Sequence, residues 1–341
     1  MQFKDISTAA GLNQKSSWST GVSMQDINND GYMDIYVCKV GNYNELQSHN
    51  ELYLNNGDLT FTEVASEVNL GFSGFSTQAA FLDYDQDGDL DLYLLNHNIH
   101  SVRSYGNTKA RKITNGLAGD RFYENKMNES GTFEEVTEFS GIYSSALGYG
   151  LAVGISDFNM DGFPDIYVGN DFHENDYLYI NNGDKTFTES IEFYTSHTSR
   201  FTMGIDIADM NNDGFIDIFF IGNQVDNKLY INNGDMTFTD ITKISNLSKS
   251  NKLIWSSGVN LIDINNDGLI DIYISNTLRK DEKLRENLLY INLGLDSNSY
   301  PKFKEMSSAY NLNDKSFSSN SQFFDYDNDG DLDLFLSLIH I

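Results

Sequence analysis

The stretch Asp26-Ile-Asn-Asn-Asp-Gly-Tyr-Met-Asp34 returns five more times in this 341-residue chain. Every copy has Asp at positions 1, 5 and 9, Asp or Asn at position 3, and Gly at position 6. The other copies occupy residues 83–91, 157–165, 209–217, 263–271 and 325–333. Oxygen donors at this spacing suit a hard cation such as Ca²⁺, and glycine supplies the tight turn that lets them converge. We therefore interpret each copy as a calcium loop, with about one ion per repeat and up to six in all.

Positions 1, 3, 5 and 9 are predicted to donate side-chain oxygens, whereas position 7 is predicted to donate its backbone carbonyl. The residue at position 7 varies in the way that a backbone ligand allows, and the glycine at position 6 does not vary. The predicted ligands are Asp26, Asn28, Asp30, Tyr32, Asp34, Asp83, Asp85, Asp87, Asp89, Asp91, Asp157, Asn159, Asp161, Phe163, Asp165, Asp209, Asn211, Asp213, Phe215, Asp217, Asp263, Asn265, Asp267, Leu269, Asp271, Asp325, Asp327, Asp329, Asp331 and Asp333.

The sequence of these loops allows two other interpretations. An EF-hand begins in the same way but needs a bidentate Glu at position 12 and a helix on each side. Position 12 is apolar in every copy: Val37, Leu94, Val168, Phe220, Ile274 and Leu336. Asp, Asn and Gly also favour turns without any metal. Six copies with the donors in the same phase favour the metal interpretation over simple turns.

The charge of the chain fits this interpretation. The formal net charge is -28, and the six loops hold 22 of the 50 acidic residues. Loops this acidic repel themselves when they fold without a counter-ion, and divalent cations would remove much of that repulsion. An acidic surface also argues against nucleic acid as a partner.

The loops recur about every 60 residues, a period typical of propellers and solenoids. A segment rich in small residues precedes each loop, and a β-branched, aromatic segment follows it. Third strands are predicted to begin at Leu52, Phe122, Leu178, Leu229 and Leu289. Fourth strands are predicted to begin at Phe61, Phe133, Phe187, Phe238 and Phe303. Most of these pairs are joined by Asn-Asn-Gly or a close variant, a strong hairpin signal. Four antiparallel strands per repeat predict an all-β fold, a β-propeller with the calcium loop between strands one and two of each blade.

These units resemble the FG-GAP/VCBS repeats of integrin-α-type β-propellers. The sequences of residues 20–31 and 169–176 are similar to those of bacterial CRTAC/UnbV-like VCBS repeat proteins. The resemblance covers essentially the whole chain. It implies a secreted or surface-anchored protein, with seven or more blades that are often followed by another domain.

Residues 1–341 are predicted to form a single propeller domain with five complete blades and a partial sixth. Phe3-Lys-Asp-Ile resembles a fourth strand, and residues 332–338 resemble a second strand. Either the ring closes as six blades with one of them incomplete, or the chain is a piece of a ring with seven or eight blades. We favour the second interpretation. No signal peptide or membrane-spanning segment is evident, and Cys38 is the only cysteine. Millimolar calcium outside the cell nevertheless favours an extracellular location.

The long connections between second and third strands are predicted to gather on the face opposite the calcium loops. The predicted ligand-binding residues there are His97, His100, Arg103, Tyr105, His173 and Glu174. The alternative is that these histidines cap turns and that the basic residues neutralise nearby acids. The first functional hypothesis is a non-catalytic adhesion module for an extracellular glycan or protein. The second is a lyase acting on acidic polysaccharides, which needs a base and a cation at the reacting centre; the candidates are His97, His100, Arg103 and Tyr105.

Overall fold

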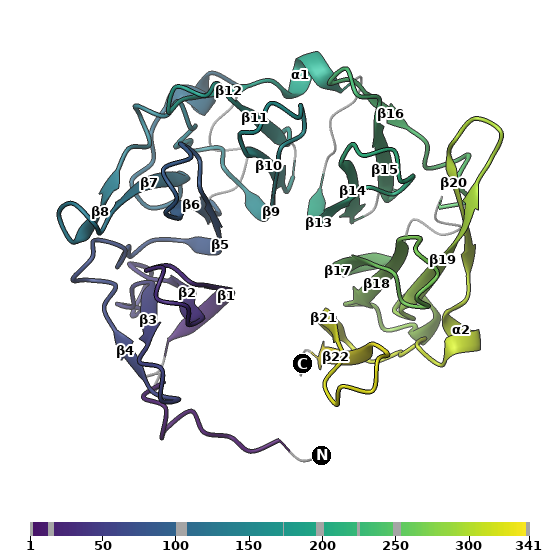
Figure 1. Ribbon diagram of the computed structural model, residues 1–341, viewed down its shortest axis with the longest axis horizontal. Helices are drawn as coiled ribbons and strands as arrows, with labels where there is room; N and C mark the ends of the chain where they lie inside the picture. The colour runs from purple at the N-terminus through teal and green to yellow at the C-terminus, as the bar shows by residue number, and fades with distance from the viewer. Residues whose placement is uncertain are drawn as a thin grey trace. The chain divides into compact units, whose positions relative to one another are not determined.

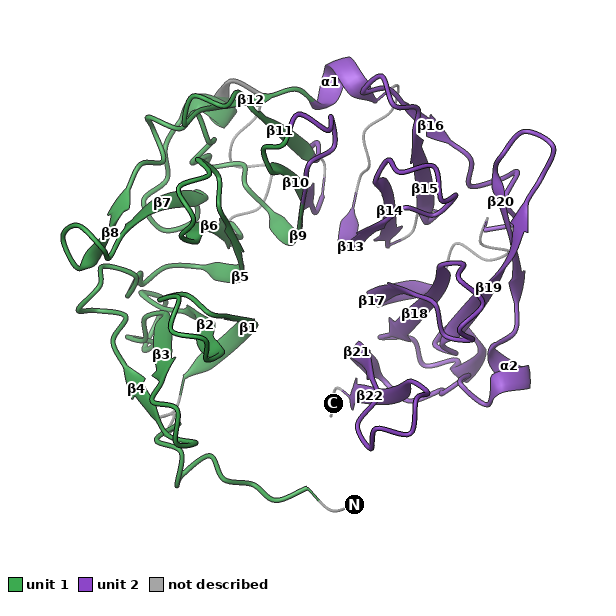
Figure 2. Ribbon diagram, viewed as in Figure 1, with its two compact units in different colours: residues 1–155, 162–168, 177–190 green, residues 156–161, 169–176, 191–341 purple. Residues whose placement is uncertain are grey.

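The computed structural model describes residues 3–12, 17–99, 108–172, 174–195, 201–223, 226–247 and 254–338. The chain divides into two compact units, coloured separately in Figure 2. Unit 1 contains residues 1–155, 162–168 and 177–190. Unit 2 contains residues 156–161, 169–176 and 191–341.

Unit 1 carries three antiparallel sheets, each with its four strands in sequence order (Figure 1). The first sheet consists of β1 (Trp18–Gln25), β2 (Asp34–Val40), β3 (Glu51–Asn55) and β4 (Phe61–Glu63). The second consists of β5 (Ser76–Leu82), β6 (Asp91–Asn96), β7 (Arg121–Lys126) and β8 (Thr132–Glu135). The third consists of β9 (Gly150–Ser156), β10 (Asp165–Asn170), β11 (Tyr177–Asn181) and β12 (Phe187–Glu189). The ends of β9 and β10 pass into unit 2.

Unit 2 continues the same pattern. The fourth sheet consists of β13 (Thr202–Ala208), β14 (Asp217–Gly222), β15 (Lys228–Asn232) and β16 (Phe238–Asp240). The fifth consists of β17 (Trp255–Ile262), β18 (Asp271–Thr277), β19 (Leu288–Leu295) and β20 (Pro301–Glu305). The last sheet has two strands, β21 (Ser318–Phe324) and β22 (Asp333–Leu338). The predicted all-β class with repeated four-stranded antiparallel sheets is confirmed.

Among the described residues, helical structure is confined to short connecting segments. These are η2 (Thr108–Lys112), α1 (Ile191–Tyr194), η3 (Glu282–Leu284) and α2 (Ser307–Tyr310). Within the described ranges, no helix has the length and apolar character needed to cross a bilayer.

The first strands of neighbouring sheets approach closely because their residues are small. A Cβ added to Gly21 would lie 2.3 Å from the carbonyl oxygen of Thr77 in the next sheet. The hydroxyl of Thr20, at a bulge in β1, donates to the carbonyl of Ser76 at 2.7 Å. The same arrangement links Thr77 to Gly150 at 2.9 Å. Small residues on the first strands thus allow the backbones of neighbouring sheets to approach closely within unit 1.

The apolar core lies between successive sheets and draws chiefly on the second and third strands. One cluster joins the first two sheets through Tyr36, Leu52 and Leu94. Another joins the fourth and fifth sheets through Phe219 and Ile272. The strands β6, β10 and β14 are buried along their whole length. Strands covered on both faces and paired on both edges read as continuous apolar runs, as these do.

One sequence prediction about secondary structure is wrong. The sequence Phe3-Lys-Asp-Ile predicts a fourth strand, but residues 3–6 are not in a strand and Phe3 is 84% exposed. A strand needs a neighbouring strand to pair with, and none of the described sheets includes residues 3–6. The residues that follow do dock, because the carbonyl of Ala10 accepts the N–H of Phe61 at 2.9 Å.

Candidate metal centres

Each acidic loop is shaped by its own carboxylates. In the first loop, Asp26 accepts the backbone N–H groups of Asp30 and Gly31 at 3.0 and 2.8 Å. Asp30 in turn accepts the N–H of Tyr32 at 2.9 Å. The same three bonds recur in the loops that begin at Asp83, Asp209, Asp263 and Asp325, with distances from 2.7 to 3.2 Å. The loop backbone is therefore arranged by hydrogen bonds within the protein.

Two positions in every loop have left-handed backbone. The glycine at position 6 has φ between 83° and 96°, as the sequence predicts. The residue at position 4 also has positive φ, between 56° and 60°, which sequence reasoning missed. Asn tolerates this conformation best among residues with a Cβ, and it occupies position 4 in four loops. Gln86 and Met160 are the exceptions.

Carboxylate oxygens converge in two of the loops. Asp83, Asp85 and Asp91 each offer an oxygen, and these oxygens lie within 4.8 Å of one another. Asp325, Asp327 and Asp333 form the same arrangement in the last loop. Three oxygen donors converging in this way fit a hard divalent cation, whereas His or Cys ligands would favour a softer metal. Within the described residues, these two clusters of acidic side chains could hold a metal ion.

Position 3 explains why these two loops stand out. It is Asp in both of them and Asn in the other four. Where it is Asn, its amide donates to the carboxylate at position 5, as Asn28 does to Asp30 at 3.0 Å and Asn211 does to Asp213 at 2.8 Å. The first, third, fourth and fifth loops thus carry one carboxylate fewer at the centre. The full set of thirty predicted ligands remains a prediction.

The ninth-position aspartates have a structural role that the sequence did not reveal. Asp217 is fully buried, and it accepts the N–H of Met210 at 2.8 Å and that of Asn232 at 2.9 Å. Met210 belongs to the same loop, whereas Asn232 begins the turn between β15 and β16. Equivalent pairs of bonds are made by Asp34, Asp91 and Asp271. Each of these carboxylates therefore ties its loop to the hairpin turn of the same sheet.

Burial has the expected effect on these carboxylates. Loss of water raises the pKa of Asp91 to about 8 and that of Asp217 to about 7, although the backbone N–H bonds act in the opposite direction. Burial also raises the pKa of Asp271 to about 6. A nearby cation favours the charged form of a carboxylate, so an ion in these loops would lower the pKa values again.

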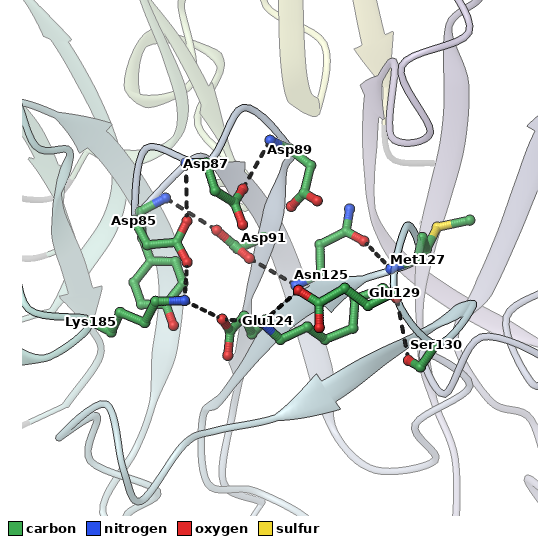
Figure 3. Close-up of polar contacts among 12 residues, drawn as sticks. Asp85, Asp87, Asp89, Asp91, Glu124, Asn125, Met127, Glu129, Ser130 and Lys185 are labelled. Carbon is green, nitrogen blue, oxygen red and sulfur yellow. Dashed lines mark hydrogen bonds and ion pairs between the residues drawn. The ribbon is translucent and has the colours of Figure 1, made fainter.

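The second loop also contacts a protein cation. The ammonium of Lys185, from the turn between β11 and β12, lies 2.5 Å from Asp85 and 2.6 Å from Glu124 on β7 (Figure 3). The side chains of Asp85 and Glu124 are only 2% and 9% exposed, so their charges depend on this lysine. Lys126 provides Glu124 with a second positive partner at 2.7 Å.

Successive loops are also linked to each other within each unit. The side chain at position 4 donates to the carbonyl of the position-6 glycine in the following loop. Asn29 reaches Gly88 at 3.0 Å in unit 1, and Asn212 reaches Gly268 at 3.2 Å in unit 2. Met160 has no polar hydrogen, so it cannot make such a bond. The position-4 residue therefore sets both the backbone turn and the contact between loops.

Sequence reasoning also missed a buried Asn or Asp near the start of each third strand. This residue lies two positions before the Leu or Phe at which the third strand was predicted to begin. It accepts the backbone N–H at the end of strand two, at 2.8 to 3.4 Å. The residues concerned are Asn50, Asp120, Asp176, Asn227 and Asn287. Their constant spacing from the Leu-Tyr or Phe-Tyr pair was visible in the sequence.

Two of the six predicted ligand-binding residues, His97 and Glu174, lie within the described part of the chain. The ring of His97 packs edge-on against Tyr149, with ring centroids 5.5 Å apart. The backbone N–H of His97 donates to the carbonyl of Phe75. Glu174 is buried. The other four members, His100, Arg103, Tyr105 and His173, lie outside the described residues. The role of this group therefore stays a prediction.

Repeated four-stranded antiparallel sheets, each with an Asp-rich loop between strands one and two, define a class of β-repeat proteins. The comparison with known families gives the particular family. The model of the FG-GAP-like repeat matches residues 26–94, 157–220 and 209–274, which together make up more than half of the chain. The chain belongs to the FG-GAP-like repeat family.

Human cartilage acidic protein 1 is 23% identical to this chain over 351 aligned residues. The alignment covers 96% of this chain and 48% of the human protein, so the chain spans about half the length of this curated relative. Among solved structures, a lectin of Agrocybe aegerita that recognises terminal N-acetylglucosamine is 18% identical. The match covers 87% of this chain and 67% of the lectin chain, with a TM-score of 0.46. A rhamnogalacturonan lyase of Bacillus licheniformis is 11% identical, with coverages of 94% and 55% and a TM-score of 0.46. We draw no functional conclusion from either structural likeness.

Proposed function

We propose that the chain is a calcium-binding, non-catalytic binding module whose sheets are the blades of a β-propeller. The observation that carries this proposal is the convergence of Asp83, Asp85 and Asp91, with its repetition at Asp325, Asp327 and Asp333. The donors are all oxygens and come from a backbone that is already turned around them, which suits Ca²⁺. Membership of the FG-GAP-like family supports the same ion for the other four loops.

In this proposal the ions are structural. Each one neutralises a loop that carries three or five aspartates and lies between strands one and two of its sheet. A site saturated at about a hundred times its dissociation constant adds about 2.7 kcal/mol to the free energy of unfolding. Filling several sites would dominate the stability of a chain with a net charge of -28. The proposed location is outside the cell, where calcium is abundant enough to fill sites of modest affinity.

The proposed partner is an extracellular glycan or protein, bound by the connections between second and third strands. Support comes from the contrast between the loops at the two ends of the sheets. The acidic loops keep one length, whereas the connection from β6 to β7 is much longer than that from β14 to β15. Variable loops on a regular scaffold are where binding residues usually lie.

Calcium binding is tested by calorimetric titration of the chelator-treated protein, together with its melting temperature with and without Ca²⁺. We expect several binding events and a large rise in melting temperature. Asp327→Asn, which removes one carboxylate from the last cluster, should weaken at least one event. Glu67→Gln is the matched control, because Glu67 is an exposed acid outside the loops. A chelator-treated protein that binds no Ca²⁺ and melts unchanged would refute the proposal.

The binding role needs a separate experiment. An array of glycans and extracellular proteins should give retention without turnover, at saturating calcium. Acidic polysaccharides incubated with the protein should show no rise in ultraviolet absorbance from unsaturated products. Such a rise, lost in His97→Ala, would favour the lyase hypothesis instead.

A further inference from the structure

The hairpin turn of the third sheet carries a positive charge at a position where other hairpin turns do not. Lys185 lies in the turn between β11 and β12 and has left-handed backbone, with φ of 70°. The residues with the same conformation in the hairpin turns of the first, fourth and fifth sheets are Leu59, Met236 and Ser299. None of these three is charged. The backbone of the turn therefore does not require a lysine at this position.

The turn is held against the second acidic loop by contacts that do not involve Lys185. The side-chain amide of Asn181 donates to the carbonyl of Tyr84 at 2.8 Å. The ring of Tyr84 also stacks on that of Phe187, with ring centroids 6.0 Å apart. All of these residues belong to unit 1. The side chain of Lys185 can therefore change position while the turn stays docked.

Lys185 and the acidic cluster of the second loop share one carboxylate. Asp85 offers one of the three oxygens that converge, together with Asp83 and Asp91. The ammonium of Lys185 lies 2.5 Å from Oδ2 of the same Asp85 (Figure 3). A calcium ion lies about 2.3–2.6 Å from its oxygen ligands. An ion and an ammonium on one carboxylate would lie within about 7 Å of each other, where two positive charges repel strongly.

Lys185 is the member of this group that can move. Its side chain is 42% exposed, whereas that of Asp85 is 2% exposed. A buried carboxylate needs a positive partner, but a long exposed side chain changes position at little cost. The ammonium also lies 2.6 Å from Glu124, so Lys185 keeps one ion pair when it leaves Asp85. Glu124 has a further partner in Lys126 at 2.7 Å.

We propose that Lys185 is a built-in competitor for the ion of the second loop, an inference that rests on the proposed calcium binding. Without calcium, the ammonium neutralises Asp85 and Glu124 together. Calcium that enters the cluster displaces the ammonium from Asp85, and Lys185 remains on Glu124. The lysine thereby weakens calcium binding at this loop and raises the calcium concentration at which the loop fills. A lysine that only held Asp85 in place would have the opposite effect, because it would strengthen calcium binding.

Calorimetric titration of the chelator-treated full chain with Ca²⁺ measures the effect. Asp83→Ala removes one ligand of the second loop, so the event that disappears in this variant belongs to that loop. Lys185→Met should strengthen the same event about tenfold, because the competing charge is gone. The turn accepts Met, since Met236 has φ of 69° at the corresponding position of the fourth sheet. Lys185→Arg keeps the charge and should bind calcium like the unmodified chain.

Lys126→Met is the matched control, because Lys126 contacts Glu124 and Glu129 rather than Asp85. Its effect on the event should stay below about twofold. A crystal structure of the calcium-loaded protein should show the ammonium of Lys185 on Glu124 and away from Asp85.

Four results would overturn the inference and leave the proposed calcium binding intact. They are unchanged or weaker binding by Lys185→Met, equal strengthening by Lys126→Met, equal strengthening by Lys185→Arg, and an intact contact between Lys185 and Asp85 beside a bound ion. A chain that binds no calcium at any loop would instead refute the proposed function, and this inference with it.

Discussion

Replacing Asp217 by Ala separates the structural role of a ninth-position aspartate from any role in binding metal. The substitution removes both acceptors for the buried N–H groups of Met210 and Asn232, which lie 2.8 and 2.9 Å away. The loop loses its tie to the turn between β15 and β16. We therefore expect Asp217→Ala to lower stability even when no calcium is available.

The expected size follows from the two unpaired groups. A buried donor left without an acceptor costs about 1–3 kcal/mol, which gives about 2–6 kcal/mol for the pair. Burial raises the pKa of Asp217 to about 7, so removing the carboxylate also relieves part of its desolvation cost. We expect a net loss of about 2–4 kcal/mol in the free energy of unfolding.

Asp213→Ala is the matched comparison in the same loop. Asp213 is exposed, and its Oδ1 accepts the N–H of Phe215 at 2.9 Å. Water can replace that acceptor, so the loss without calcium should stay below about 1 kcal/mol. Both variants should lose stabilisation by calcium.

Urea denaturation of the unmodified chain and of both variants at pH 8, with excess chelator and again with saturating calcium, gives the loss of stability of each variant in each condition. A chelator-treated Asp217→Ala protein as stable as the unmodified chain would refute the reasoning. Equal losses for both variants in chelator would also contradict it, because the buried and exposed positions would then be equivalent.

Three further changes test other parts of the structure. Burial raises the pKa of Asp120 to about 7, so the folded state binds a proton that the unfolded state releases, and stability should fall by up to about 1.4 kcal/mol per pH unit between pH 4 and 7. Asp120→Asn should abolish that pH dependence, because the Asn side chain does not titrate. The position accepts Asn, since Asn50 and Asn287 fill it in the first and fifth sheets and donate there to a tyrosine hydroxyl. Urea midpoints measured across this pH range make the comparison, and identical pH profiles for the two proteins would contradict the prediction. Lys185→Met leaves Asp85 and Glu124 without their shared cation, so it should cost about 1 kcal/mol in chelator and enlarge the rise in melting temperature on adding calcium; an unchanged response would show that the lysine does not compensate this loop. Burial raises the pKa of the Cys38 thiol, so a disulfide reagent should react with it only after denaturation, and rapid labelling of the native protein would count against the packing described.

Local patterns were enough to predict most of the repeated sheet. The Asp-x-Asp/Asn-x-Asp-Gly phrase located the loops, because their geometry depends on neighbouring residues and on a left-handed glycine. The Asn-Asn-Gly turns located the hairpins for the same reason. The strand at Phe3 was mispredicted because a strand exists only with a partner, and the local sequence says nothing about whether the partner is present.

The amino-acid sequence was sufficient for the all-β class, the repeat length and the positions of the acidic loops, since each depends on contacts within about ten residues. Long-range contacts assigned the remaining roles. Asp217 resembles its loop neighbours in the sequence, yet only the turn at Asn232 makes it a buried acceptor. Lys185 lies about 100 residues from Asp85 and contacts it because two sheets pack together. Such pairings depend on how separate sheets are placed, which no short stretch of sequence encodes.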